Sequence, residues 1–451
     1  MKIITKAGRN HKQPAPIPVE FSAKNLTPFG GLGLLSQFIR KLNMEKALNE
    51  INPAQAEIIK EGKYSVSKKI LALVYGLVCD LERPAETEVF QRDKAFQTLM
   101  DYESYPDQST HSRFLSSFVV QGAQEIGEKN TQTLLKVRHD FVDWLKLTLD
   151  MDSHVKTVYG KQQRADVGYN PKKPGRKSYH PLFCFLGETR DFLLGKLRAG
   201  SKYTSAGAIP FLKDCLRIIP QHILQLYLRG DCGFYSFPYL SFLEGKKIKY
   251  AIAVKLYKTI QNKLGGLDYR DIGDGIGVSE YEQCLRQGKK QLSCRMIVIR
   301  EEVKEGQPAK KQPKLFELKS HSYQVIVTNI RQEPPEVIWR WYNGRANIEN
   351  MIKEAGLGFG LEVSPSHKYA GNMAYLQIGM LAYNLINWFK EKVLNQTQQK
   401  KMLKWIRRRF FLIAGRLVRS GRNLILKLSR DYPWQEEYRK AEHRLEGLQF
   451  G

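Results

Sequence analysis

Apolar residues recur at helical spacing in the first third of the chain. The stretches 33–51, 68–82 and 109–127 each place apolar side chains three or four residues apart, so each would have one apolar face as a helix. Helices of this kind bury their apolar faces against one another. The spacing therefore predicts a helical region over residues 31–140.

The pattern changes to short apolar runs at about residue 141. Five such runs predict strands: LKLTLDMD (145–152), PLFCFLGE (181–188), DFLLGKLRAG (191–200), LQLYLRGD (224–231) and KYAIAVKL (249–256). Helical segments are expected near 205–219 and 236–244. Three strands followed by helix and strand in alternation predict an α/β fold, a mixed sheet with helices packed on it.

Residues 257–330 have a different composition. Gly-rich and charged loops separate the strand-like runs 294–302 and 322–330. This alternation of loop and strand predicts an inserted β-rich module.

Helix is predicted again from about Glu336. The apolar run 373–389 carries three amide side chains and stops at Lys390, which favours a buried core helix over a membrane span. Basic residues and Gly turns over 407–429 predict a hairpin near the end of the chain.

The charge of the chain narrows the range of partners. Its 451 residues include 72 Lys and Arg against 45 Asp and Glu, a formal net charge of +27. Such a field favours a polyanion, above all nucleic acid, and leaves open a ribosome-associated protein or a basic membrane-surface protein. The six cysteines form no C-x-x-C pair, which argues against a zinc or disulfide scaffold and fits a reducing cytoplasm.

Two aspartates interrupt the first predicted strand. Asp150 and Asp152 lie two residues apart in LTLDMDSH, so a strand would place both carboxylates on one side. Each raises the cost of ionising the other, and a bound cation would offset that cost. The pattern therefore indicates one side of a metal site.

Asp231 ends the strand-like run before Gly233, at the carboxyl end of a strand where ligands gather in α/β sheets. A plain turn aspartate is the alternative.

A third acid lies in WRWYNGRANIENMIKE. On one helix, Tyr342, Arg345, Glu349 and Lys353 would share a face that is not apolar. A solvated face with i,i+4 ion pairs is the alternative. Taken with the two strand acids, Glu349 completes a set of oxygen ligands suited to Mg²⁺ or Mn²⁺.

These three stretches carry a family resemblance. LDMDS, LRGDCGF and YNGRANIE resemble the three acidic motifs of the DDE transposases of bacterial insertion sequences. The chain is most similar to the branch with a Y-x2-R-x3-E glutamate helix preceded by a β-rich insertion. The likeness extends over most of the chain, including 158–181 and 410–428. It implies a ribonuclease-H-like core, a mixed sheet with helices on both faces that the β-rich insertion interrupts, and an α-helical N-terminal domain.

The resemblance also implies roles for individual residues. Asp152, Asp231 and Glu349 would be the catalytic acids and hold two Mg²⁺ (or Mn²⁺) ions, with Asp150 as the alternative first ligand or a residue that orients it. Tyr342 and Arg345 would contact DNA near the scissile phosphate.

One position departs from the family pattern. The lysine that often follows the glutamate by seven residues is Gly356 here, so Lys353 is the nearest candidate for its DNA contact. The basic run 172–177 is a second candidate phosphate-binding patch, for which a solvated face is the alternative. Its basic residues are Lys172, Lys173, Arg176 and Lys177.

Six regions are expected along the chain. They are a basic flexible arm (1–30), a helical DNA-binding region (31–140), the first part of the core (141–256), the β-rich insertion (257–330), the rest of the core with the glutamate helix (331–395) and a basic C-terminal region (396–451).

The function expected is that of a DNA transposase that binds element ends and catalyses metal-dependent strand cleavage and transfer of the cut-and-paste type. Its partners would be double-stranded DNA, as terminal inverted repeats and target, and a second copy of the chain. No membrane contact is expected, and the location would be the bacterial cytoplasm, at the nucleoid when bound to DNA. A catalytically inactive or domesticated DNA-binding protein is the alternative.

Overall fold

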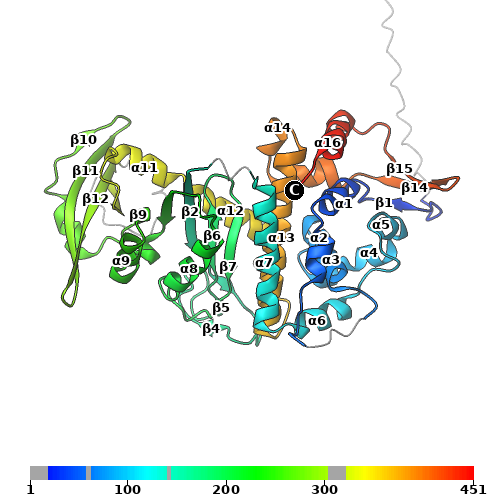
Figure 1. The fold of residues 1–451 in the computed structure, drawn as a ribbon, viewed down its shortest axis with the longest axis horizontal. Coiled ribbons are helices and arrows are strands. Elements are labelled where there is room, and N and C mark those ends of the chain that lie inside the picture. Colours follow the sequence, from blue (N-terminus) through cyan, green and yellow to red (C-terminus); the bar gives the residue numbers. More distant parts are fainter. Residues whose placement is uncertain (1–18, 57–61, 140–143, 303–320, 451) are drawn as a thin grey trace, which may run out of the picture.

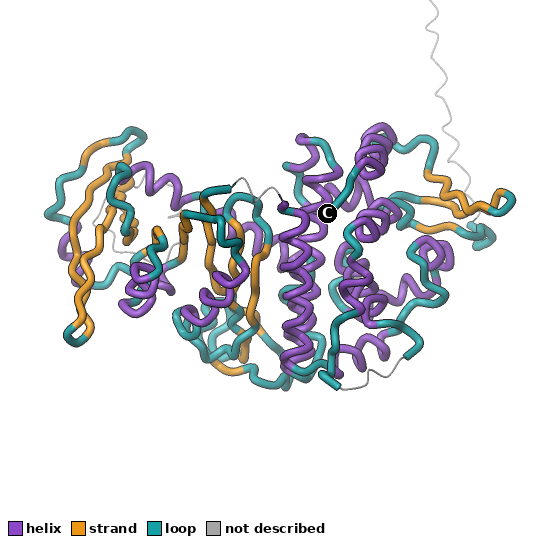
Figure 2. Tube along the Cα trace, in the orientation of Figure 1, coloured by secondary structure: helices purple, strands orange, loops and turns teal. Residues whose placement is uncertain are grey.

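The computed structural model describes residues 19–56, 62–139, 144–302 and 321–450 (Figure 1). Residues 1–18 of the expected arm and 303–320 of the expected insertion lie outside this part of the chain. The protein is a mixed α/β structure with one large sheet and many helices (Figure 2).

The helical spacing of the first third is confirmed. The helices are α1 (Leu32–Lys41), α2 (Met44–Asn49), α3 (Val66–Val78), α4 (Glu88–Arg92), α5 (Lys94–Leu99), α6 (Gln108–Ser117) and α7 (Val120–Val137). Side-chain caps start three of them: Ser65 accepts a hydrogen bond from the Lys68 amide at α3, Asp93 from the Phe96 amide at α5, and Asp107 from the Thr110 amide at α6.

A nine-stranded sheet follows, in the order β10-β11-β12-β13-β9-β8-β2-β6-β7. Its first five strands in sequence confirm the five predicted runs: β2 (Lys146–Ser153), β6 (Leu182–Leu186), β7 (Phe192–Lys196), β8 (Gln225–Gly230) and β9 (Lys249–Ala253). The expected helices are α8 (Ala208–Ile218) and α9 (Phe237–Gly245). Strand β2 pairs in parallel with β8 and antiparallel with β6, and β8 pairs in parallel with β9.

The strands of the predicted insertion continue this same sheet. They are β10 (Arg270–Asp271), β11 (Ile276–Gln287), β12 (Lys290–Glu302) and β13 (His321–Thr328), preceded by the short helix α10 (Lys258–Leu264). Antiparallel pairing of β13 with β9 joins them to the core strands.

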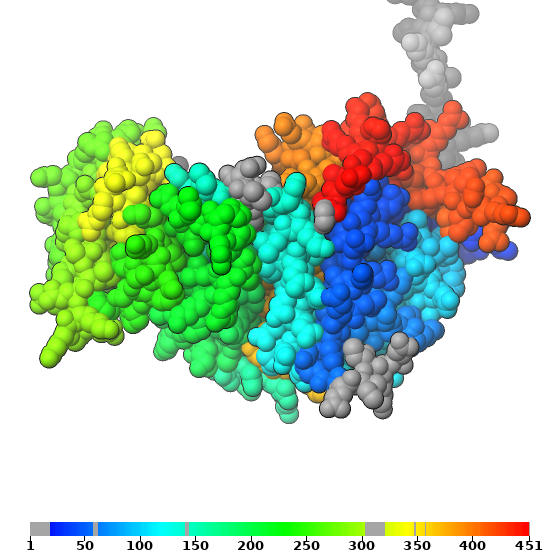
Figure 3. Space-filling view, viewed as in Figure 1, coloured from blue at the N-terminus to red at the C-terminus, as the bar shows by residue number. Residues whose placement is uncertain are grey.

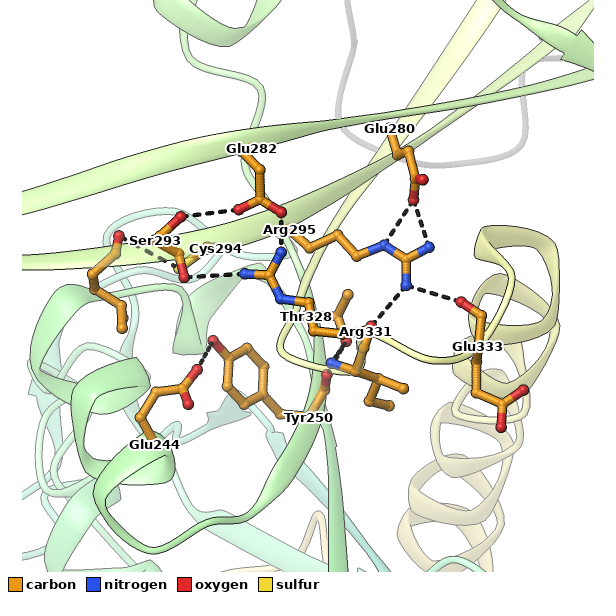
Figure 4. A network of polar contacts seen from close by, with 12 residues as sticks. Glu244, Tyr250, Glu280, Glu282, Ser293, Cys294, Arg295, Thr328, Arg331 and Glu333 are labelled. Carbon is orange, nitrogen blue, oxygen red and sulfur yellow. Dashed lines mark hydrogen bonds and ion pairs between the residues drawn. The ribbon is translucent and has the colours of Figure 1, made fainter.

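Two arginines link these strands to the segment that leads into α11 (Pro335–Asn343) (Figure 4). Arg295 donates from Nε to Glu280 at 2.7 Å and from Nη1 to the carbonyl oxygens of Ile330 and Glu333 at 2.7 and 2.9 Å. Arg331, in the segment between β13 and α11, forms an ion pair with Glu282 in β11. The long β11–β12 hairpin is thereby tied to the start of α11.

Helix α13 (Tyr369–Val393) packs along α7, and these two helices lie between the other N-terminal helices and the sheet (Figure 1). Helix α13 confirms the predicted core helix. Two of the amide side chains in its apolar run can be buried there because they form hydrogen bonds with the neighbouring elements. Asn384 bonds both backbone groups of Phe192 in β7 and the Asn130 side chain in α7. Gln377 donates to the Gly195 carbonyl oxygen, also in β7. Among the described helices, none has the length and apolar character needed to cross a membrane.

The C-terminal region returns to the N-terminal helices, where both lie side by side (Figure 3). After α14 (Gln396–Gln399), α15 (Leu403–Ile406) and a helical turn at Arg407–Phe411, the predicted hairpin forms as β14 (Gly415–Ser420) and β15 (Asn423–Leu428), followed by α16 (Gln435–Gly447). Strand β1 (Leu26–Thr27) pairs with β14. The expectation of a flexible arm is therefore wrong for these two residues, because their backbone is held in a sheet.

Candidate active site

Three acids from separate elements line one cavity of 910 Å³. Asp152 is the next-to-last residue of β2, Asp231 directly follows β8, and Glu349 lies in the first turn of α12 (Ala346–Gly358). The predicted residues Tyr342, Arg345, Lys353 and Lys172 line the same cavity. Three of the sequence-predicted acids and three of the predicted cations therefore line one cavity.

The parallel pairing of β2 with β8 brings two of these acids together. Met151 pairs with Gly230, so the residues that come next, Asp152 and Asp231, lie side by side at the carboxyl ends of the two strands. Asp231 caps the turn that follows, accepting a hydrogen bond from the Gly233 amide at 3.0 Å.

Burial dominates the ionisation of both acids. It raises the pKa of Asp152 to about 7, against the opposing effect of Arg345 and with the help of Asp231 and Glu349. Burial likewise raises the pKa of Asp231. Two buried carboxyl groups that disfavour each other's charge attract a cation.

Asp150 has a different environment from Asp152. It is 1% exposed, does not line the cavity, and forms an ion pair with Arg229 on the neighbouring strand. The two strand aspartates thus differ in environment: Arg229 holds Asp150 in a close ion pair away from the cavity, whereas Asp152 lines it.

Arg345 lies between two acids of the cavity. Its Nη2 is 3.6 Å from Asp152 Oδ1, and its Nη1 is 3.5 Å from Glu349 Oε1. The side chain is 9% exposed. Although burial lowers the pKa of Arg345, the nearby acids raise it above its usual value, so the group stays charged.

The prediction that Tyr342, Arg345, Glu349 and Lys353 share one helix is wrong. Helix α11 ends at Asn343, Gly344 and Arg345 form a turn, and α12 begins at Ala346. Arg229 donates to the Trp341 carbonyl oxygen at 2.6 Å, which satisfies a group at the end of α11. A Cβ atom on residue 344 would lie 2.5 Å from Arg229 Nη1, so glycine makes room for this contact.

Tyr342 nevertheless faces the site from the end of α11. Its hydroxyl donates to the Gly230 carbonyl oxygen at 3.3 Å, next to Asp231, and the side chain is buried.

Of the basic residues in the run 172–177, only one lines the cavity. Lys172 lines it, whereas Lys173 contacts the Tyr159 ring and hydroxyl. Arg176 and Lys177 are exposed and do not line the cavity.

Sequence reasoning missed several residues of this site. His154 and Glu362 line the cavity and form a hydrogen bond with each other, and Lys255 lines it as well. Only His154 had a local signal, because it follows Asp152 by two residues. Glu362 lies far away in sequence, and nothing in its flanking residues marks it.

The donors fit a hard divalent cation in type. Carboxylate oxygens are what Mg²⁺ and Mn²⁺ prefer, and burial raises the pKa of Asp152, so a bound cation would stabilise its ionised form. The three acids are farther apart than the ligands of one bound metal ion would be, since no three His, Cys, Asp or Glu side chains of the described residues lie close enough to hold such an ion. Arg345 takes the position between Asp152 and Glu349 in this arrangement.

Comparison with known proteins gives one match over nearly the whole chain. A family model described as transposase DDE domain group 1 matches residues 10–450. No curated protein matches the sequence. Seven chains of solved structures match. One belongs to a cryo-EM structure of the piggyBac transposase synaptic complex with hairpin DNA, at 14% identity and a TM-score of 0.43, covering 85% of this chain and 79% of that one.

Proposed function

The chain belongs to the transposase DDE domain group 1 family, and on that premise we propose that it binds the ends of a mobile element and catalyses metal-dependent cleavage and transfer of DNA strands. Cut-and-paste transposition by a bacterial insertion sequence is the specific form proposed. The Y-x2-R-x3-E spacing of Tyr342, Arg345 and Glu349 supports that branch of the family.

The meeting of three acids at one cavity carries this proposal. Asp152, Asp231 and Glu349 come from two strands and a helix, yet all line the same 910 Å³ space. A protein that only bound DNA through its positive charge would have no use for three acids lining one cavity, because they repel phosphate.

A ribonuclease-H-like core is part of the proposal. The order β7-β6-β2-β8-β9 supports it, with β2 in the middle, an antiparallel hairpin on one side and two parallel strands on the other. The acids sit where ligands gather in such sheets, at the carboxyl ends of β2 and β8.

Asp152, Asp231 and Glu349 would hold the metal, as two Mg²⁺ or Mn²⁺ ions. Bound in this way, the ions supply activation of the attacking hydroxyl and stabilisation of the leaving 3′-oxygen. Asp152 is favoured over Asp150 as the first ligand, because the charge of Asp150 is already paired with Arg229.

The cations around the cavity would hold the DNA backbone. Arg345, Lys353 and Lys172 offer donors to phosphate oxygens, and Tyr342, whose hydroxyl bonds the residue before Asp231, would contact DNA near the scissile phosphate. Lys173, Arg176 and Lys177 would extend the same contact along the DNA beyond the cavity.

The partners proposed are double-stranded DNA, as element ends and target, and a second copy of the chain that brings the two ends together. The bacterial cytoplasm is the place where such a reaction would occur.

Mn²⁺-dependent cleavage of DNA that carries the element's own ends tests the function. Asp152→Asn and Asp231→Asn should abolish cleavage and leave DNA binding intact, while Asp214→Asn, at a half-buried aspartate paired with Arg217 outside the cavity, should cut normally. Full activity of either cavity variant would remove that acid from the site. Binding without cleavage by the unaltered protein would favour the DNA-binding alternative.

A further inference from the structure

The β14–β15 hairpin presents a surface that the proposed active site does not use. Residues 407–430 contain eight Arg and Lys and no Asp or Glu. Four of them lie on the hairpin and are exposed: Arg416, Arg419, Arg422 and Lys427. Within the described part of the chain, none of these four forms an ion pair or a side-chain hydrogen bond, so the hairpin keeps its full charge.

The register places two of these cations directly opposite each other. Arg416 pairs with Lys427 across the two strands, and like charges in that position destabilise a sheet. No acid within the hairpin offsets the repulsion. The repulsion therefore lowers the stability of the hairpin by itself, and binding of an external anion between the two cations would relieve it.

The hairpin has one inner and one outer face. On the inner face, Leu426 and Leu428 lie against Gly33 and Gly30, at the start of α1. Because side chains alternate, Arg416 and Lys427 point the other way, together with the pair Val418 and Ile425. The outer face thus combines cations with apolar side chains, and Ile425 is 43% exposed.

The shape of the hairpin suits a groove in DNA. Ser420 pairs with Asn423, so the turn holds two residues, and Gly421 at its first position has φ +58°, as a tight hairpin turn requires. A two-stranded ribbon of this kind fits the major groove of B-form DNA, which is about 12 Å wide. The apolar side chains suit thymine methyl groups, and the cations suit phosphates and guanine edges.

We propose that the β14–β15 hairpin inserts into the major groove of double-stranded DNA and is a second DNA-binding element of this protein. The inference rests on the proposed function, because it takes DNA as the partner. The hairpin lies beside β1 and α5, on the opposite side of α13 from the strands that carry the acids (Figure 1). Substitutions in the hairpin should therefore affect DNA binding without disturbing the active-site cavity.

Salt-dependent binding of the full chain to a random-sequence DNA duplex tests the proposal, with Arg416→Ala/Lys427→Ala against the unaltered protein. Loss of two phosphate contacts should weaken binding about tenfold or more and reduce the slope of log affinity against log salt by about 2. The melting temperature should stay the same or rise, because the opposed cations are gone. The matched control is Arg439→Ala/Arg444→Ala, which removes two exposed cations from α16.

The outcomes separate this inference from the proposed function. If the hairpin variant binds with the affinity and salt slope of the control, the hairpin does not contact DNA and the inference is overturned, while the active-site proposal stands. If the unaltered protein does not bind the duplex, both fail. A duplex RNA of the same sequence, whose deep major groove excludes a ribbon, should bind more weakly and lose little in the variant; an equal loss on RNA would overturn insertion into the groove.

Discussion

Arg229 holds Asp150 through two parallel hydrogen bonds, from Nε to Oδ1 and from Nη2 to Oδ2, each 2.6 Å long. Both side chains are buried, and they lie opposite each other on the parallel strands β8 and β2. The same guanidinium reaches the Trp341 carbonyl oxygen at the end of α11. One arginine therefore compensates a buried acid and fixes the helix that leads to Arg345.

Arg229→Ala should lower the free energy of unfolding by about 3 kcal/mol or more, because it leaves Asp150 buried and unpaired. Urea unfolding followed by circular dichroism measures the change. Arg217→Ala is the matched control, since its ion pair with Asp214 is at the surface and should contribute less than about 1 kcal/mol. Equal effects of the two substitutions would contradict the importance of the buried pair.

Arg345→Ala should strengthen Mn²⁺ binding to the DNA-free protein by about tenfold or more, because a cation is removed from beside Asp152 and Glu349. Calorimetric titration with Mn²⁺ measures the affinity. DNA cleavage should fall at the same time, since the proposed contact of Arg345 with phosphate is lost. Arg340→Ala, on the neighbouring helix, serves as control and should bind Mn²⁺ as the unaltered protein does. An unchanged Mn²⁺ affinity in Arg345→Ala would show that the guanidinium does not compete with metal.

His111 should make stability depend on pH. It is fully buried in α6, neither ring nitrogen has a hydrogen-bond partner among the described residues, and burial lowers its pKa to about 4 against a weaker opposing effect of Asp107. The unfolded chain takes up a proton near pH 6.5 and the folded chain does not, so stability is lost as the pH falls from 6.5 towards 4.

Between pH 7 and pH 5 this group should lower the free energy of unfolding by about 2 kcal/mol. Urea unfolding at both pH values, compared with His111→Leu, isolates the contribution. The variant should lose less stability than the unaltered protein over this interval, and parallel losses would rule out His111 as the cause.

Arg295→Lys should destabilise the β11–β12 hairpin, because lysine cannot bond Glu280 and the carbonyl oxygens of Ile330 and Glu333 together. We expect a loss of about 2 kcal/mol in thermal or urea unfolding. Arg331→Lys, at a more exposed ion pair, should cost clearly less. If both substitutions cost the same, the two carbonyl contacts of Arg295 contribute little.

The sequence allowed most of the fold to be predicted where the pattern is local. Alternation in LTLDMD marked β2, and the amides in 373–389 separated a core helix from a membrane span. Asp231 could be found because a strand end and a following glycine are adjacent in the chain. The hairpin at 415–428 was visible from its turn glycine.

Contacts between distant segments were beyond such reasoning. Arg229 meets Asp150 only through the parallel register of β8 with β2, which no local pattern encodes. The break between α11 and α12 follows from the Arg229 contact at Gly344, so helical spacing alone predicted one helix. The continuation of the core sheet by β10–β13 likewise depends on the pairing of β13 with β9.

The position of α13 has a consequence for the order of folding during synthesis. This helix covers both α7 and the edge strand β7, yet it is translated after all the strands of the sheet. A nascent chain that ends before residue 369 leaves an apolar face on each half, without the amides that bond β7. Although domains commonly fold from the N-terminus as they emerge, here neither half can complete its core until α13 has left the ribosome. Ribosome-bound fragments that stop short of α13 should therefore remain sensitive to protease and depend on chaperones, and protection should arise in a single step once that helix is released.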